Sequence, residues 1–339
     1  MNEQRPSQKT ITLAEVALRA GVSKMTASKV MRNTGSISQA TQDRVREAAS
    51  VLGYVPNRLA GALSSKTRDI VAVVLPSIND KIFGDVVSGI NEILRPAGYI
   101  TFIGETHFDG KMEEDILSTV LSLHPAGIIL TGGICRSENA LSMLKRWSCP
   151  TIQIWDDSDS DFDGSVAPAH AEAGRLIAQL FHDRGFKNPA YIGAELQKDL
   201  CAARRFDAFH QMLSEFGRAP NAITPPDLPR QWDTGRALAA ELMKAYPETD
   251  AIYCLNDAMG LGALAWLHEN GYDIPSRVAV AGFNGTSSLN AVRTRLTTVH
   301  VERHELGLIA ARAILDLLNG HSIEKVSLLE PELIVGNTT

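Results

Sequence analysis

Between residues 70 and 301, short apolar runs alternate with amphipathic helical patterns, and this alternation limits the possible folds more than any other feature. Runs of this kind are expected of parallel strands buried on both faces. The predicted strands are IVAVVL (70–75), YITFIG (99–104), GIILTG (127–132), TIQIWD (151–156), AYIG (190–193), AIYCLN (251–256), VAVAGF (278–283) and LTTVHV (296–301). The predicted helices include 84–95, 170–184, 202–216, 235–245, 258–270 and 303–319. The alternation predicts a doubly wound α/β fold, with so many strands that we expect two parallel sheets and a cleft between them.

A second pattern precedes this region, in residues 12–33. Apolar residues recur there with the i, i+3, i+4, i+7 spacing of one helix face: Leu13, Val16, Ala17 and Ala20. Thr12 and Glu15 have the spacing of a capping box, Gly21 can end this helix, and Ser23 can cap a second one. Two short helices joined by a tight turn predict a helix-turn-helix, whose second helix enters the DNA major groove. On spacing alone, an ordinary helical hairpin with solvated lysines remains the alternative.

The second helix and the residues after it complete a small helical headpiece. We expect Ala27, Val30 and Met31 to face inward, whereas the residues facing outward would be Lys24, Met25, Ser28, Lys29 and Arg32. A third helix is predicted over residues 38–52, with Ser38 as its N-cap and Gly53 as its C-cap. Three helices over about fifty residues have the size of a DNA-binding domain.

The distribution of charge supports a division of roles. The whole chain of 339 residues carries a net charge of −6, which taken alone argues against nucleic acid as a partner. Residues 1–68, however, contain 11 Lys and Arg against 4 Asp and Glu, a balance of +7, and the remainder carries −13. A basic head on an acidic body is expected when only the head contacts phosphates.

Several other classes of protein are disfavoured. The segment MNEQRPSQK lacks the apolar stretch of a signal peptide, and no apolar run is long enough to span a membrane. The four cysteines are widely spaced and are expected to be buried free thiols: Cys135, Cys149, Cys201 and Cys254. No metal-ligand cluster, phosphate-binding loop or nucleophile motif is present, so we expect a cytoplasmic protein without metal, cofactor or enzymatic activity.

The segment GYVPNRLAGALSS (53–65) comes directly after the third predicted helix and before the strand IVAVVL. This order resembles the LacI/GalR family of bacterial transcription regulators over the whole chain. The resemblance implies a headpiece (1–55), a hinge helix and linker (56–68) and a core (69–339) that binds an effector and dimerises. It also implies two subdomains of the periplasmic-binding-protein type, at about 69–167 with 299–327 and at about 168–298 with 328–339. Three crossovers would join these subdomains near Pro168, Thr298 and Leu328.

The resemblance also assigns residues to DNA. Lys24, Met25 and Lys29 occupy the base-reading positions, where Met25 would make only apolar contacts. Phosphate contacts would come from hydroxyls and helix N-termini at Thr12, Ser23, Thr26 and Ser28, and Arg32 and Asn57 complete the expected DNA-binding set. Leu63 matches the hinge leucine that wedges into the minor groove, a role compatible with packing on a dimer mate.

Ligands of open α/β sheets bind at the carboxyl ends of the strands. Asp257 follows such a strand, where it could accept hydrogen bonds from ligand hydroxyls or, alternatively, cap the next helix; Asn256 is a weaker candidate of the same kind. The resemblance places Arg205, in the segment RFDAF, over the effector, where an arginine fork suits a carboxylate or paired hydroxyls, whereas Arg204 is expected to be a solvated charge.

Three further residues match effector positions of the family. Phe83 would pack on the effector, or else be an ordinary core residue, and Trp232 would stack on a sugar face, or else pack at the rim. Asn284 stands in GFNG, where many relatives carry a carboxylate, and this neutral residue could adapt the cleft to an anionic ligand. Lys81 adds a positive charge near the mouth of the cleft, unless it is simply solvated.

The segments quoted from this chain look closest to gluconate-utilisation repressors, which implies D-gluconate or a phosphorylated relative as an effector that releases DNA. Neutral sugars and purines are the competing effectors, and a solute-binding protein is the competing class. No heptad helix is appended after the final GNTT, so we expect a homodimer that reads a pseudo-palindromic, double-stranded operator.

Overall fold

The computed structural model of the protein describes residues 11–32, 34–55, 69–78, 81–158, 161–286 and 294–339. The chain forms two compact units, residues 1–68 and residues 69–339. Asn57 and Leu63, two of the expected DNA contacts, lie outside the described residues. Among the residues described, no helix is long and apolar enough to cross a membrane.

The first unit contains the three expected helices, α1 (Leu13–Ala20), α2 (Lys24–Met31) and α3 (Gln39–Leu52). The capping box is confirmed, because the Thr12 side chain accepts from the Glu15 amide while the Glu15 carboxylate accepts from the Thr12 amide. Gly21 adopts a left-handed conformation with φ of 63°, which costs glycine little and ends α1. Local signals therefore fix the turn between the first two helices.

The three helices bury one shared apolar cluster, which includes Val16, Ala17, Ala20, Ala27, Val30, Val45, Ala48 and Ala49. Met31 is half-buried against this cluster, so all three residues expected to face inward from α2 do so. Ser38 precedes α3, but its hydroxyl makes no capping bond to the helix backbone and lies 3.0 Å from the Thr41 hydroxyl instead.

The second unit contains two six-stranded sheets. The first sheet is entirely parallel and has the order β11-β5-β4-β3-β1-β2. Its strands are β1 (Ile70–Leu75), β2 (Ile100–Glu105), β3 (Gly127–Thr131), β4 (Thr151–Ile154), β5 (Gly164–Pro168) and β11 (Val326–Leu329). With its helices it forms the first subdomain, and the two-sheet α/β fold expected from the sequence is confirmed.

The second sheet has the order β12-β10-β9-β8-β6-β7 and is parallel except for β12, which runs antiparallel to β10 at one edge. Its strands are β6 (Pro189–Ile192), β7 (Asn221–Ile223), β8 (Ala251–Cys254), β9 (Ala279–Asn284), β10 (Thr297–His300) and β12 (Glu332–Ile334). With its helices it forms the second subdomain. β8 and β9 are buried along their whole length, as expected for inner strands covered on both faces.

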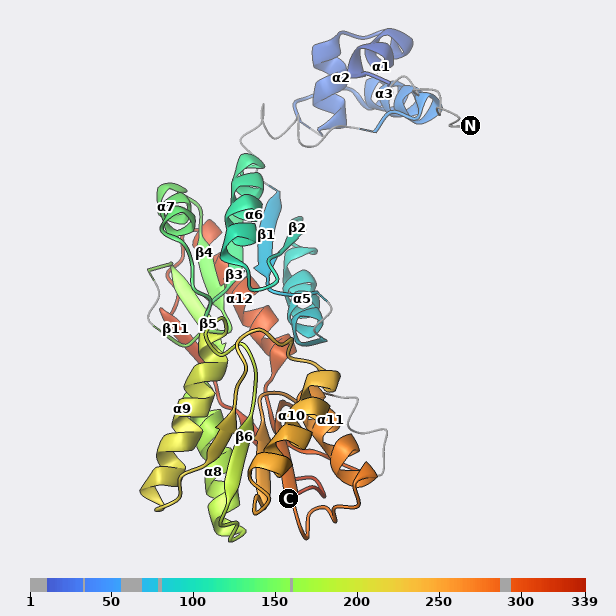
Figure 1. Cartoon of the computed structure of the whole chain (residues 1–339). Coiled ribbons are helices and arrows are strands. Elements are labelled where there is room, and N and C mark those ends of the chain that lie inside the picture. The colour runs from blue at the N-terminus through green and yellow to red at the C-terminus, as the bar shows by residue number, and fades with distance from the viewer. Residues whose placement is uncertain (1–10, 33, 56–68, 79–80, 159–160, 287–293) are drawn as a thin grey trace. The chain divides into compact units, whose positions relative to one another are not determined.

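Helices cover the sheets, and in Figure 1 each subdomain has its own set. The first subdomain carries α5 (Lys81–Leu94), α6 (Gly110–Ser122), α7 (Glu138–Arg146) and α12 (Arg303–Leu318). The second carries α8 (His170–Asp183), α9 (Leu200–Glu215), α10 (Trp232–Ala245) and α11 (Asp257–Glu269). The helices pack in pairs, α5 with α12, α8 with α9 and α10 with α11.

The chain passes between the two sheets three times: after β5, after β10 and after β11. The first passage directly follows Pro168. The second follows His300, so the subdomain boundary expected at residue 299 falls inside β10. The third follows Leu329, one residue beyond the expected position at Leu328.

One cysteine departs from expectation. Cys149, Cys201 and Cys254 are buried free thiols, but Cys135 is exposed in the loop before α7. Arg204 also departs from expectation, since it is ion-paired and not merely solvated. Its partners matter for the site described next.

Candidate functional site

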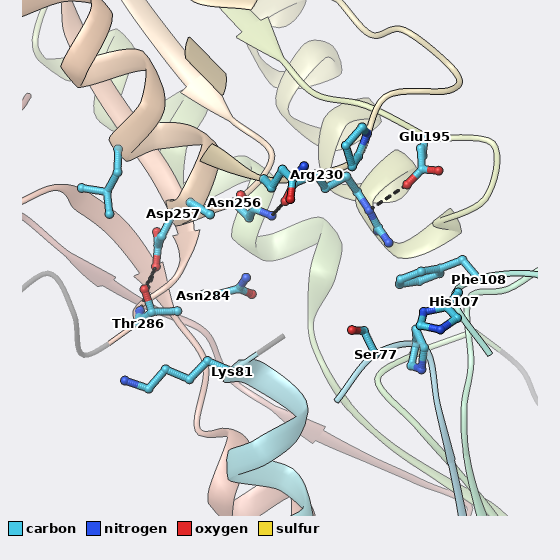
Figure 2. A pocket seen from close by; sticks show the side chains of 15 residues that line it. Ser77, Lys81, His107, Phe108, Glu195, Arg230, Asn256, Asp257, Asn284 and Thr286 are labelled. Atoms are coloured by element: carbon cyan, nitrogen blue, oxygen red, sulfur yellow. Dashed lines mark hydrogen bonds and ion pairs between the residues drawn. The ribbon is translucent and has the colours of Figure 1, made fainter. Parts of the chain in front are cut away.

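A cavity of about 490 Å³ lies between the two subdomains, at the carboxyl ends of their strands. Ser77, Lys81, His107 and Phe108 reach it from the first subdomain. From the second come Glu195, Arg230, Asn256, Asp257, Asn284 and Thr286 (Figure 2). A smaller cavity of about 40 Å³ shares four of these residues, Phe108, Arg230, Asn256 and Asn284, and is also lined by Phe83, Trp155, Arg205 and Phe283. Residues near the carboxyl ends of strands in both subdomains therefore line one region, as expected for a ligand site of open α/β sheets.

Arg205 lines the smaller cavity from α9 and is only 4% exposed. Its Nη1 donates to His170 Nδ1 at 3.0 Å, and its guanidinium carbon lies 3.8 Å from the centre of the Phe283 ring. Within the described part of the chain, Arg205 forms an ion pair with no carboxylate. A buried charge without a counter-charge is costly, so an anion entering this cavity would relieve that cost.

His170 determines how Arg205 is held. Its Nε2 lies 2.6 Å from the carbonyl oxygen of Trp155, and because a carbonyl only accepts, Nε2 must carry the proton. Nδ1 is then left as the acceptor for Arg205. Complete burial, followed by the neighbouring Arg205 charge, lowers the pKa of His170 to about 3, so this imidazole is uncharged.

Close packing of α8 on α9 fixes the position of Arg205. A Cβ atom on Gly174 of α8 would lie 2.1 Å from the Arg205 carbonyl oxygen, far closer than real atoms approach. Gly174→Ala should therefore push α9 away, weaken effector binding and lower the free energy of unfolding by about 1–3 kcal/mol. Calorimetry and urea unfolding measure the two effects. Gly84→Ala is the matched control, since that helical glycine has open space around it and should tolerate the methyl group.

Arg230 is the second arginine of the site, and it lines both cavities. Its Nε lies 3.4 Å from a carboxylate oxygen of Glu195, and its Nη1 donates to the Asp199 carboxylate. The guanidinium also lies over the ring of Phe108, at 3.8 Å, which joins the two subdomains across the cavity (Figure 2). In contrast to Arg205, Arg230 has its charge balanced by the protein.

Asp257 and Asn256 begin α11 at the floor of the larger cavity. The alternative role of Asp257 as a helix cap is wrong, because Asn256 is the N-cap and accepts from the Met259 amide at 2.9 Å. The Asp257 carboxylate instead accepts from the Thr298 hydroxyl at 2.6 Å and from the Thr286 amide at 2.8 Å. Burial raises the pKa of Asp257 to about 6, although these hydrogen bonds oppose the shift.

This shift predicts a pH dependence of stability. The folded chain holds the Asp257 proton more tightly than the unfolded chain, whose pKa is near 3.8, so the stability present below pH 3.8 is lost as pH rises through about 6. Asp257→Asn cannot ionise. The unfolding free energy of the wild type, relative to this variant, should therefore fall by up to roughly 3 kcal/mol between pH 4 and pH 7. Urea unfolding at a series of pH values measures the difference; a difference that is flat or rises with pH would contradict it.

Asn284 ends β9 with an unusual backbone φ of 111°. Its buried Oδ1 has no hydrogen-bond partner among the described residues, so it is an acceptor available to a ligand. Its carbonyl oxygen accepts from Arg303, whose Nε lies 3.0 Å from the Asp85 carboxylate of α5. One cavity residue is thereby connected directly to a helix of the first subdomain.

Of the remaining candidate residues, Phe83 and Lys81 line a cavity and Trp232 does not. Phe83 is buried and lies 5.8 Å from the Trp155 ring, so it is at once a core residue and part of the smaller cavity's wall. Lys81 lines the larger cavity. Trp232 is not brought to the site: it is 42% exposed, its ring lies beside Arg236, and it is not among the residues that line either cavity.

Other contacts join the subdomains beside the cavity. Arg204 donates to Asp156 at 3.1 Å and to Asp157, both of which follow β4 in the first subdomain. The Leu200 amide of α9 donates to the carbonyl oxygen of Gly133 at 2.8 Å, again from one subdomain to the other. Arg204 and Arg205 are adjacent in α9, so this helix carries both a residue that lines the smaller cavity and a residue that pairs with the first subdomain.

In the headpiece, α2 presents polar and basic side chains to solvent. Lys24, Lys29 and Arg32 are exposed, Met25 is 69% exposed, and Thr26 and Ser28 are half-buried. The hydroxyl of Ser23 caps the helix by accepting from the Thr26 amide at 3.1 Å, and Thr12 has the same role for α1. The two helix N-termini and the exposed side of α2 have the chemistry of a DNA-binding surface.

Comparison with known proteins identifies the chain. Residues 12–57 match the family of bacterial regulatory proteins of the lacI type, and residues 178–339 match the periplasmic binding protein-like domain. The HTH-type transcriptional regulator GntR of Pseudomonas aeruginosa is 33% identical over 319 residues, which cover 94% of this chain and 92% of that protein. The chain belongs to the LacI family. It is therefore a DNA-binding transcriptional regulator with an effector-binding domain, and not an enzyme.

Two further relatives extend this comparison. The regulator GntR of Escherichia coli K12 is 29% identical over 323 residues, or 95% of each chain. The crystal structure of a LacI-family transcriptional regulator from Silicibacter pomeroyi is 34% identical, with a TM-score of 0.90 over 97% of this chain and 99% of that one. Regulators of the LacI family bind operator DNA and small-molecule effectors.

Sequence reasoning missed several cavity residues of this LacI-family chain, notably Arg230 and Phe108, and it also missed His170, which lines neither cavity but accepts a hydrogen bond from Arg205. Arg230 stands two residues before Trp232, in the loop that precedes α10. His170 directly follows the first crossover, which the sequence located. His170 could have been identified by its position, because it is a polar residue at a crossover between the two subdomains.

Proposed function

We propose that this regulator represses genes of sugar-acid catabolism and that D-gluconate, or a related sugar acid, releases it from its operator. The observation that carries this proposal is Arg205, a buried guanidinium that faces the smaller cavity without a carboxylate partner among the described residues. A carboxylate ligand would supply that partner in a bidentate geometry. The similarity to two regulators named GntR supports the same effector class.

The rest of the cavity suits a polyhydroxylated chain. Asp257, Asn256 and the unpaired Oδ1 of Asn284 offer acceptors to ligand hydroxyls. Phe83 and Phe108 offer apolar surface from the first subdomain. Trp232 is not part of the proposed site. Arg230, two residues earlier in the chain, lines both cavities instead.

We infer that effector binding changes the arrangement of the two subdomains. A ligand that contacts both of them, and binds one arrangement better, shifts the equilibrium between arrangements. Arg303 links the backbone of Asn284 to Asp85 of α5, and Arg204 links α9 to Asp156, so movement at the cavity is transmitted to the first subdomain. The hinge segment 56–68 precedes that subdomain in the chain. Effector and operator would then oppose each other reciprocally.

On DNA, we propose that a homodimer reads a pseudo-palindrome. Lys24, Met25 and Lys29 would contact bases, and Arg32 and Asn57 would assist them. Thr12, Ser23, Thr26 and Ser28 would contact phosphates, while Leu63 would wedge into the minor groove at the centre of the operator. Sedimentation of the free protein and of its operator complex would establish the stoichiometry.

Calorimetry with a panel of ligands tests the effector class. We expect D-gluconate to bind, and D-glucose and purine bases to bind much more weakly, because neither supplies a carboxylate to Arg205. Tight binding of a neutral sugar or of a purine, with no heat from any sugar acid, would assign the cavity to the competing effector class.

A further inference from the structure

We propose that His170 is the residue that makes this cavity select an anionic effector. It holds Arg205 in place through an acceptor that carries no charge, which leaves the guanidinium charge for the ligand. This inference rests on the proposed function, in which the effector is a sugar acid. His170 contacts Arg205 and lines neither cavity, so its proposed role is that of a positioning residue.

The structure anchors His170 from both subdomains. Trp155 follows β4 in the first subdomain with a backbone φ of 75°, and its carbonyl oxygen accepts from His170 Nε2 at 2.6 Å. The imidazole also contacts two rings, with its centre 5.7 Å from that of Trp155 and 6.0 Å from that of Phe283. The bond to Trp155 and these ring contacts hold the imidazole in an orientation in which Nδ1 faces Arg205.

The charge of this acceptor decides what Arg205 can bind. A carboxylate at the position of Nδ1 would hold the guanidinium equally well but would neutralise it. The protein already uses that solution for Arg230, which Glu195 and Asp199 balance. Arg205 and Arg230 line the same small cavity but have different partners. The charge of Arg230 is balanced within the protein, whereas the charge of Arg205 is left for a ligand.

His170 also keeps Arg205 away from an internal partner. Asp199 lines the same cavity and caps α9 by accepting from the Ala202 amide at 2.9 Å. An Arg205 side chain released from His170 could turn toward this carboxylate, which would cancel the charge before a ligand arrives. Loss of the imidazole is therefore expected to weaken binding of an anion more than binding of its neutral counterpart.

The test compares His170→Asn with His170→Asp. The two side chains have the same shape, both offer an oxygen near the position of Nδ1, and both lose the bond to Trp155, so their main difference is the charge of the carboxylate. Calorimetry would use D-gluconate and D-glucitol, which has a hydroxymethyl group in place of the carboxylate. The measured quantity is the ratio of their dissociation constants for the full-length protein.

We expect the wild type to prefer D-gluconate by roughly 10- to 150-fold, the range of a charge-assisted contact. His170→Asn should keep most of that preference, and His170→Asp should reduce it at least tenfold, mainly by weakening D-gluconate. His182→Asn is the matched control, since His182 lies on the same helix but stacks on Phe216, and its ratio should equal that of the wild type.

Failure of the proposed effector class and failure of the proposed role of His170 give different results. A wild type that shows no preference for D-gluconate overturns the proposed effector class, and this is seen before any variant is measured. A wild type with the preference, together with equal ratios for the Asn and Asp variants, overturns the role of His170.

A measurement on the wild type covers the case in which a variant does not fold. Nitrogen-15 spectra of histidine-labelled protein at neutral pH should show His170 as the neutral tautomer with its proton on Nε2. A doubly protonated ring, or a proton on Nδ1, would overturn the proposal, because neither form can accept from Arg205.

Discussion

Replacing Arg205 by alanine should abolish the response of operator binding to the effector while the free protein still binds its operator. The guanidinium is the one cation of the smaller cavity that no described carboxylate balances, so its loss removes the charge-assisted contact expected to hold a sugar acid. Such a contact contributes about 1.5–3 kcal/mol, which corresponds to roughly a 10- to 150-fold loss of effector affinity. Calorimetry with D-gluconate and an operator-binding assay measure the two properties separately.

Two comparisons make this result specific. Arg175→Ala is a suitable control, because Arg175 is exposed on α8, where it pairs with Glu172. Asp257→Asn should weaken the effector less than Arg205→Ala does, since asparagine keeps an acceptor in the cavity. An Arg205→Ala protein that folds and responds to the effector like the wild type would remove Arg205 from the site.

Deleting residues 1–68 should abolish operator binding and leave effector binding nearly intact. This segment holds the helix-turn-helix and a net charge of +7, whereas the remaining chain carries −13 and would repel DNA. The core of residues 69–339 forms a compact unit with its own two sheets, so the truncated protein should fold. Operator binding by the truncated core would contradict the assignment of the headpiece.

A single substitution refines this prediction. Lys29 is exposed on α2, and Lys29→Ala should lower operator affinity, while Arg312→Ala in the core should not, because Arg312 is exposed on α12 beside Glu305. Wild-type affinity should also fall steeply as salt increases, since phosphate contacts release counterions. An affinity independent of salt would argue against binding led by phosphates.

The headpiece could be predicted well because its signals are local. The Thr12–Glu15 capping box and the left-handed Gly21 act within a few residues, so the sequence specifies both helix ends. The inner strands were equally clear because burial on both faces requires unbroken apolar runs. By contrast, β7 has only three residues, and β5 (GSVAP) contains no run of β-branched residues, so neither appears among the predicted strands.

The site was predicted less completely because side-chain direction depends on where each helix begins. Asp257 and Asn256 were both identified, but the cap belongs to Asn256, and this shift of one residue turns Asp257 toward Thr298. Likewise α10 begins at Trp232, which leaves Arg230 in the preceding loop facing the cavity and the tryptophan beside Arg236. The pairing of Arg205 with His170 joins residues 35 positions apart, which no local pattern encodes.

The central claim is that a sugar acid bound in the cavity weakens binding of the operator. Fluorescence anisotropy of a labelled operator, titrated with the full-length protein with and without saturating D-gluconate, tests it most directly. A coupling free energy of about 1–3 kcal/mol per site predicts that D-gluconate lowers operator affinity roughly 5- to 150-fold. An operator affinity that saturating D-gluconate leaves unchanged would contradict the claim.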